Sequence, residues 1–181
     1  MKKLHAVTLF LLIGMYAMAQ TPQVLFYGYV EEGIFVDPSG DVKKPRKQKN
    51  PEKLKNVTVY VYQGDVLINT VTGRESGFYA VLLESGAKYS VNFEKDGYFC
   101  KSFEVDCRNM QFPETDAAMK CLTDVSLFKK FENDDILALC SVPFAKCSYK
   151  NGDMAWDVEY TERAKEKFYE LAQPYYMASG K

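Results

Sequence analysis

Residues 57–62 read Val-Thr-Val-Tyr-Val-Tyr, and this stretch decides the fold class. Its valines alternate strictly with threonine and tyrosine, a period of two that places each set on its own face of a β-strand. β-Branched and aromatic side chains also fit the pleated, half-buried surface of a sheet. The pattern predicts a strand whose valines face the core. The outward row is then Thr58, Tyr60 and Tyr62.

Similar short segments follow as far as residue 105. Turns that contain glycine separate them, at 63–65, 73–77, 84–88 and 95–97. Residues 24–36 add one or two strands before them. A sheet with one apolar face must bury that face against another layer, and short strands at this spacing are typical of sandwiches and barrels. We therefore expect an all-β fold, an antiparallel β-sandwich, over residues 20–110.

Residues 111–181 are expected to form a C-terminal extension that ends in one α-helix. The Asn151-Gly152 dipeptide predicts a hairpin within it. The helix is expected at about residues 158–173, with Pro174 as its end. We expect its apolar face to pack on the sandwich, and docking of another protein is the alternative. That face comprises Tyr160, Ala164, Phe168 and Leu171.

Five short motifs occur in a set order over residues 24–106. They are Gly28-Tyr29-Val30, Leu54-Lys55-Asn56-Val57-Thr58-Val59, Gly77-Phe78-Tyr79, Gly86-Ala87-Lys88-Tyr89 and the run from Phe93 to Gly97-Tyr98. In this order they resemble the carboxypeptidase regulatory-like domains, which share the transthyretin-like (prealbumin-like) sandwich. The resemblance implies an accessory module without a catalytic set, used as a spacer, a protein-docking unit or a carbohydrate binder. A fold alone selects none of these roles.

The first 19 residues have the pattern of a secretory signal peptide. Lys2 and Lys3 precede an uncharged, mostly apolar run from Ala6 to Tyr16, and Ala17-Met18-Ala19 matches a cleavage site. The apolar run is too short to span a hydrocarbon core of about 30 Å, and no cysteine stands at the cleavage site for lipid attachment. We therefore expect a periplasmic or secreted protein with no membrane span after cleavage.

Composition argues against several functions. Cleavage would remove His5, the only histidine, which excludes Ser-His-Asp and Cys-His catalysis. The glycine motifs match neither a P-loop nor a dinucleotide site. Loss of Lys2 and Lys3 leaves 21 of 23 basic residues against 24 acidic ones, which does not indicate nucleic-acid binding. We expect no enzyme and no cofactor; a hydrolase that uses paired carboxylates such as Asp153 and Asp157 is the remote alternative.

Five cysteines remain in the mature chain: Cys100, Cys107, Cys121, Cys140 and Cys147. An odd number leaves at least one thiol free or paired between chains. Without a CxxC pair or a histidine, a zinc site is not expected. We expect mostly unpaired cysteines or a single bridge, and the spacing does not fix the pairing.

Two groups of residues are candidates for binding. The loop at 37–53, longer than the resembled family usually has there, is rich in lysine and proline. It is either an electrostatic site for phosphate, lipopolysaccharide or acidic glycan, or simply a solvated loop. Its basic cluster includes Lys43, Lys44, Arg46 and Lys47.

The second group is the outward tyrosine row, in which Tyr60 and Tyr62 are joined by Tyr79 if that side chain points outward. Exposed tyrosines stack on sugars or anchor protein interfaces; alternatively, the C-terminal extension covers the row. The sequence thus favours a non-enzymatic binding or structural module for protein contact in the bacterial cell envelope. A carbohydrate-binding module is the alternative.

Overall fold

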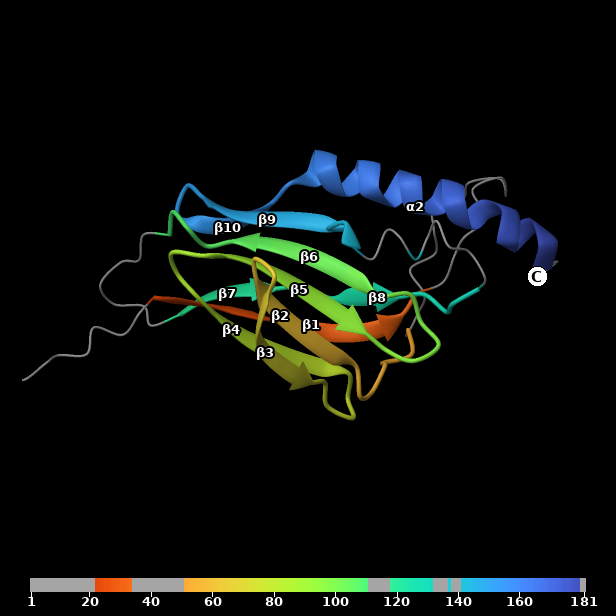
Figure 1. Ribbon diagram of the computed structural model, residues 1–181, viewed down its shortest axis with the longest axis horizontal. Helices are drawn as coiled ribbons and strands as arrows, with labels where there is room; N and C mark the ends of the chain where they lie inside the picture. The colour runs from red at the N-terminus through yellow and green to blue at the C-terminus, as the bar shows by residue number, and fades with distance from the viewer. Residues whose placement is uncertain (1–21, 34–50, 111–117, 132–136, 138–140, 180–181) are drawn as a thin grey trace, which may run out of the picture.

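The alternating segments form strands as expected, and they assemble into two stacked sheets with one long helix beside them (Figure 1). The computed structural model describes residues 22–33, 51–110, 118–131, 137 and 141–179. The predicted signal peptide and all of the basic loop before residue 51 lie outside these residues. The expected all-β sandwich with a C-terminal helix is confirmed.

The smaller sheet is built around β1 (Gln23–Glu32). β4 (Phe78–Glu84) pairs with β1 in antiparallel orientation. On the other side of β1 lie two strands that follow each other along it, both parallel to it: β7 (Ala118–Leu122) and then β8 (Val125–Leu127). β1 is therefore bonded on both sides along most of its length.

The larger sheet has six strands in the order β10-β9-β6-β5-β2-β3. Their bounds are β2 Thr58–Gln63, β3 Val66–Thr72, β5 Lys88–Glu94, β6 Lys101–Asp106, β9 Ala145–Lys150 and β10 Asp153–Trp156. All neighbours are antiparallel except β6 and β9, which are parallel. Both sheets are thus mixed rather than purely antiparallel. β7 and β9 return to the sheets over long connections, as parallel pairing requires, and β8 continues along β1 directly after β7.

The residues that follow position 111 complete both sheets, since β7 and β8 extend the smaller sheet and β9 and β10 the larger one. The hairpin predicted at Asn151-Gly152 joins β9 to β10. Its two residues have φ angles of 53° and 91°, as the common two-residue hairpin turn with positive φ at both positions requires.

The core lies between the two sheets, and the predicted inward row is confirmed: Val57, Val59 and Val61 are buried. Aromatic rings from both sheets meet there. The ring of Phe93 lies 4.8 Å from that of Tyr79 and 5.6 Å from that of Phe103, both nearly edge-on. Such packing favours one arrangement of the sheets, because aromatic pairs prefer tilted and edge-to-face geometries.

Between β7 and β8, residues 123 and 124 pass very close to the backbone of β1 at residues 27–29. The amide of Thr123 donates to the carbonyl of Tyr27 (2.8 Å), and the Tyr79 hydroxyl donates to the carbonyl of Thr123 (2.7 Å). The amide of Tyr29 donates to the Asp124 carboxylate (2.9 Å). A Cβ at Gly28 would lie 2.0 Å from the Thr123 carbonyl oxygen, so only glycine permits this approach.

The helix α2 (Val158–Ser179) begins at the predicted residue, where the Asp157 carboxylate accepts a hydrogen bond from the amide of Tyr160 (2.9 Å). It continues past Pro174, contrary to the expected end, because an internal proline removes one backbone hydrogen bond and does not oblige a helix to stop. Phe168 and Ala172 are buried against Phe99 and Phe128, so the helix packs on the strands as expected. Within the described part of the chain, no helix is long and apolar enough to cross a membrane.

We predict that Gly28→Ala destabilises the protein by about 3 kcal/mol, the upper end of the usual cost of overpacking. The added methyl group would force the Thr123 backbone away and weaken the pairing of β1 with β7. Urea unfolding of both proteins measures the difference. Gly73→Ala is the control, because its Cβ would lie no closer than 3.4 Å to its neighbours. Equal stability of the two variants would contradict the prediction.

Candidate functional site

The predicted tyrosine row is only partly on the surface. Tyr60 and Tyr62 lie half-buried on the outer face of β2, with ring centroids 6.5 Å apart. Tyr79 instead points into the core, where it is 1% exposed and its pKa is raised by burial. Both rows of β4 are apolar, so its alternation did not identify the inward face. The basic cluster at Lys43, Lys44, Arg46 and Lys47 lies outside the described residues.

A polar hollow adjoins Tyr60 on this outer face. It has a volume of about 330 Å³, and Tyr98 supplies its second aromatic side chain. The Tyr98 hydroxyl donates to the Glu32 carboxylate (2.8 Å), and burial together with this bond raises the pKa of Tyr98 to about 12. The hollow is lined by Asn56, Thr58, Tyr60, Glu94, Lys95, Asp96, Tyr98, Cys100 and Lys130.

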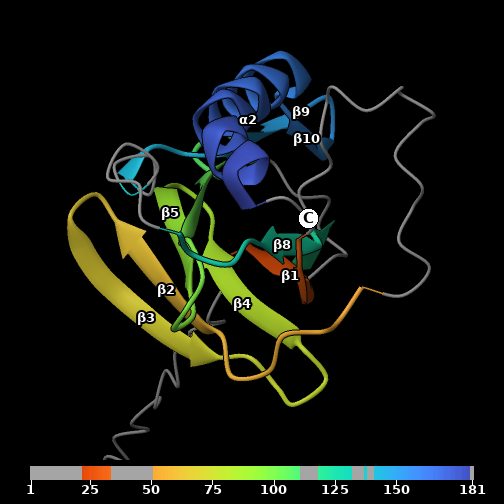
Figure 2. The same cartoon turned by 90° about the vertical axis from the view of Figure 1, so that its right-hand side faces the viewer.

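The strand β3 forms one rim of the larger sheet (Figure 2). It pairs with β2 on one side, and its other edge has no strand partner among the described residues. Three apolar side chains near its start are exposed: Val66 (64%), Leu67 (48%) and Ile68 (47%). Leu67 is opposite Tyr62 in the β2–β3 register, so the outer tyrosine row continues onto this free edge.

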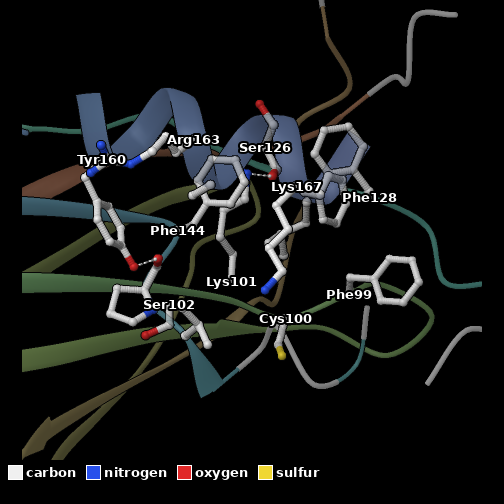
Figure 3. A pocket seen from close by; sticks show the side chains of 15 residues that line it. Phe99, Cys100, Lys101, Ser102, Ser126, Phe128, Phe144, Tyr160, Arg163 and Lys167 are labelled. Atoms are coloured by element: carbon white, nitrogen blue, oxygen red, sulfur yellow. Dashed lines mark hydrogen bonds between the residues drawn. The ribbon is translucent and has the colours of Figure 1, made fainter. Parts of the chain in front are cut away.

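An aromatic cavity of about 200 Å³ lies beneath α2 (Figure 3). Its walls come from β6, β8, α2 and the segment before β9, so it lies where the helix covers one side of the two sheets. Four phenylalanines line it: Phe99, Phe128, Phe144 and Phe168. The sequence interpretation missed this site, although Phe168 was expected to face the strands, because its walls come from distant parts of the chain.

The Lys101 side chain extends from the start of β6 into this aromatic cluster. Its ammonium donates to the Ser126 carbonyl (2.7 Å) and lies 3.9 Å from the centre of the Phe144 ring and 5.2 Å from that of Phe128. Solvent still reaches part of the residue, but protein surrounds the ammonium. This burial, with a smaller contribution from the charge of Lys165, lowers the pKa of Lys101 to about 7. No carboxylate in the described ranges forms an ion pair with it.

The cysteines agree with the expectation of few bridges. Cys100 is disulfide-bonded, whereas Cys107, Cys121 and Cys147 are free and buried. The sulfurs of Cys121 and Cys147 lie 4.0 Å apart across the two sheets. Burial raises the pKa of Cys107 to about 12, which keeps that thiol protonated. In the part of the chain that the structure describes, no three metal-ligating side chains cluster.

Comparison with known proteins assigns no family. No family model and no curated protein matches the chain. Partly similar solved structures include 3-chlorocatechol 1,2-dioxygenase from Rhodococcus opacus 1CP (12% identity, 60% of each chain, TM-score 0.35). A second is the shaft pilin SpaA from Lactobacillus rhamnosus GG (14% identity, 61% of this chain and 52% of the pilin, TM-score 0.37). A third is S.CueP (14% identity, 58% of this chain and 60% of S.CueP, TM-score 0.30).

The matched region spans three fifths or less of the length of each of these proteins. Similarity at this level indicates no activity, ligand or partner. The resemblance to carboxypeptidase regulatory-like domains therefore stays a prediction.

The buried ammonium predicts a specific pH dependence of stability. The pKa of Lys101 is lower in the folded protein (about 7) than in the unfolded chain (about 10.4), so the unfolded chain binds more protons between these values. The contribution of Lys101 to the free energy of unfolding therefore rises with pH between these two pKa values, by up to about 1.4 kcal/mol per pH unit. Urea unfolding from pH 6 to 10 should show Lys101→Met more stable than wild type at pH 6, with the difference shrinking as pH rises.

Lys120→Met is the control for this measurement, because Lys120 is exposed on β7. Its difference from wild type should not change over the same range. Parallel pH profiles for wild type and Lys101→Met would contradict the assignment of a buried, desolvated ammonium.

Proposed function

We propose that this chain is an exported, non-catalytic module that binds another protein of the bacterial cell envelope through the free edge of β3. The observation that carries the proposal is an edge strand of seven residues, Val66–Thr72, without a single charge or proline. Export is supported by the signal-peptide pattern of residues 1–19. A non-catalytic role is supported by the absence of histidine from the expected mature sequence.

A free strand edge exposes backbone donors and acceptors that another strand can pair with. Proteins that must remain unpaired usually place lysine, proline or inward-pointing charges at such edges. β3 has none of these residues, and its exposed apolar side chains lie beside the free edge. We infer that the occupant is an extended segment of a different polypeptide, which adds a seventh strand beyond β3. Side chains of that segment would contact Leu67 and Tyr62 on the outer face.

We predict that a photo-crosslinking amino acid at position 68, in cells that export the full chain, captures one discrete polypeptide. The same amino acid at position 82 is the control, because Leu82 is equally apolar and exposed but lies on β4 of the other sheet. Ile68→Lys, tested with the crosslinker at position 67, should reduce capture at least tenfold, because strand addition would bury its charge. Leu82→Lys should leave capture unchanged.

Mass spectrometry of the crosslinked peptide decides the nature of the partner. The proposal requires a segment of a different protein, joined at the β3 edge. Crosslinks only to a second copy of this chain, equal capture from positions 68 and 82, or no capture would each overturn it.

Carbohydrate binding is the second candidate, and the polar hollow beside Tyr60 is the observation that favours it. Tyrosine rings offer an apolar face to a sugar ring, and nearby amide, carboxylate and ammonium groups can bond its hydroxyls. The hollow combines Tyr60 with Asn56, Glu94 and Asp96. A sugar bound there would lie on the outer face of the larger sheet, next to the proposed protein-binding edge.

If this candidate is correct, a glycan array probed with the mature chain gives saturable binding, and Tyr60→Ala weakens it at least tenfold. Tyr29→Ala is the control, because this tyrosine is exposed on β1 and does not line the hollow. The absence of any array signal, or equal affinity of Tyr60→Ala and wild type, would remove carbohydrate binding from consideration.

A further inference from the structure

The aromatic cavity beneath α2 has a strong charge asymmetry. Three basic side chains line it, Lys101 from β6 and Arg163 and Lys167 from α2, and its lining residues within the described ranges include no aspartate or glutamate. Arg163 pairs with Glu159 on the exposed surface of the helix. Lys167 forms no ion pair within the described ranges. In Figure 3 the Lys101 and Lys167 side chains approach the cavity from opposite walls.

Lys101 has more hydrogen-bonding capacity than the protein uses. An ammonium has three N–H donors, and among the described residues one acceptor bonds to it, the Ser126 carbonyl. Cation–π contact with the Phe144 and Phe128 rings offsets part of the free-energy cost of burying this ammonium. A buried charge is nevertheless costly unless a counter-charge pairs with it. A carboxylate in the cavity would provide that counter-charge and accept the unused donors.

The size and walls of the cavity define the rest of the ligand. A dry apolar cavity of about 150 Å³ accepts benzene, and this one has about 200 Å³. The additional space is sufficient for a carboxylate group on a benzene-sized body. The four phenylalanines offer that body ring contacts of the kind aromatic pairs prefer.

We propose that the cavity beneath α2 binds a small hydrophobic monocarboxylate of about the size of benzoate. Its carboxylate accepts hydrogen bonds from Lys101, and its apolar body lies among Phe99, Phe128, Phe144 and Phe168. Lys167 adds a second positive charge from α2. This site lies away from the β3 edge, so it is independent of the protein binding proposed above; with the hollow at Tyr60 it shares the lining residue Cys100.

Titration calorimetry of the mature chain with benzoate, benzamide and inorganic phosphate tests the site. Benzoate should bind with a Kd on the order of 0.1–1 mM, within the range open to a ligand of this size. Benzamide has the same shape without the charge, and phosphate has the charge without the apolar body. Both should bind at least tenfold more weakly than benzoate.

Two variants and a control locate the binding. Lys101→Met keeps the length of the side chain without its charge and should lower benzoate affinity at least tenfold, as should Phe144→Ala through loss of a wall. Lys120→Met should bind as wild type does. Thermal unfolding establishes that each variant is folded. Nuclear Overhauser contacts between benzoate protons and the rings of Phe144 and Phe168 should place the ligand directly.

The proposal is overturned if benzoate shows no saturable binding up to 10 mM, about a hundredfold above the tighter expected Kd. It is also overturned if folded Lys101→Met binds benzoate as tightly as wild type does. Equal affinity for benzamide would show an uncharged aromatic site, and equal affinity for phosphate a general anion site. Either result rejects the carboxylate assignment.

Discussion

The structure depends on one close backbone crossing, where residues 123 and 124 pass over Gly28. Three hydrogen bonds hold this crossing: Thr123 to Tyr27, Tyr79 to Thr123 and Tyr29 to Asp124. They pair backbone groups at the break between β7 and β8. The Thr123 carbonyl, which accepts from Tyr79, is buried, and an unpaired group there would be costly. The glycine is required because a side chain would occupy the position of the Thr123 carbonyl.

The crossing also determines where the cavity forms. It sets the register in which β8 follows β7 along β1, and β8 carries the Ser126 carbonyl that Lys101 contacts. Phe128, directly after β8, packs against Phe168 of α2 with ring centroids 5.1 Å apart. The smaller sheet, the start of β6 and the helix thus meet around one ammonium group. The free edge of β3 lies elsewhere on the larger sheet, so the two proposed sites share the scaffold but no residue.

Local patterns in the sequence predicted the local structure well. The Val-Tyr alternation of residues 57–62 identified both faces of β2, and Asn151-Gly152 and the start of the helix at Val158 were also found. Two features set by distant contacts were missed: the parallel pairing of β7, β8 and β9, and the aromatic cavity. The direction of Tyr79 stayed open, because both rows of β4 are apolar. Local propensity predicts that the helix ends at Pro174, yet the helix continues to Ser179. Nothing local distinguishes Val66–Thr72 as an edge strand, because edge position is a property of the assembled sheet.

Native-state hydrogen exchange of the amides of Thr123 and Tyr29 tests the central role of the crossing most directly. If the crossing is integral to the sandwich, both amides exchange only through global unfolding, with the same opening free energy as the amides of Val24 and Phe26 in β1. Exchange of Thr123 and Tyr29 at a clearly lower free energy, while the pairing of β1 with β4 stays protected, would contradict the account. The segment from β7 to β8 would then be a separable addition to the sandwich.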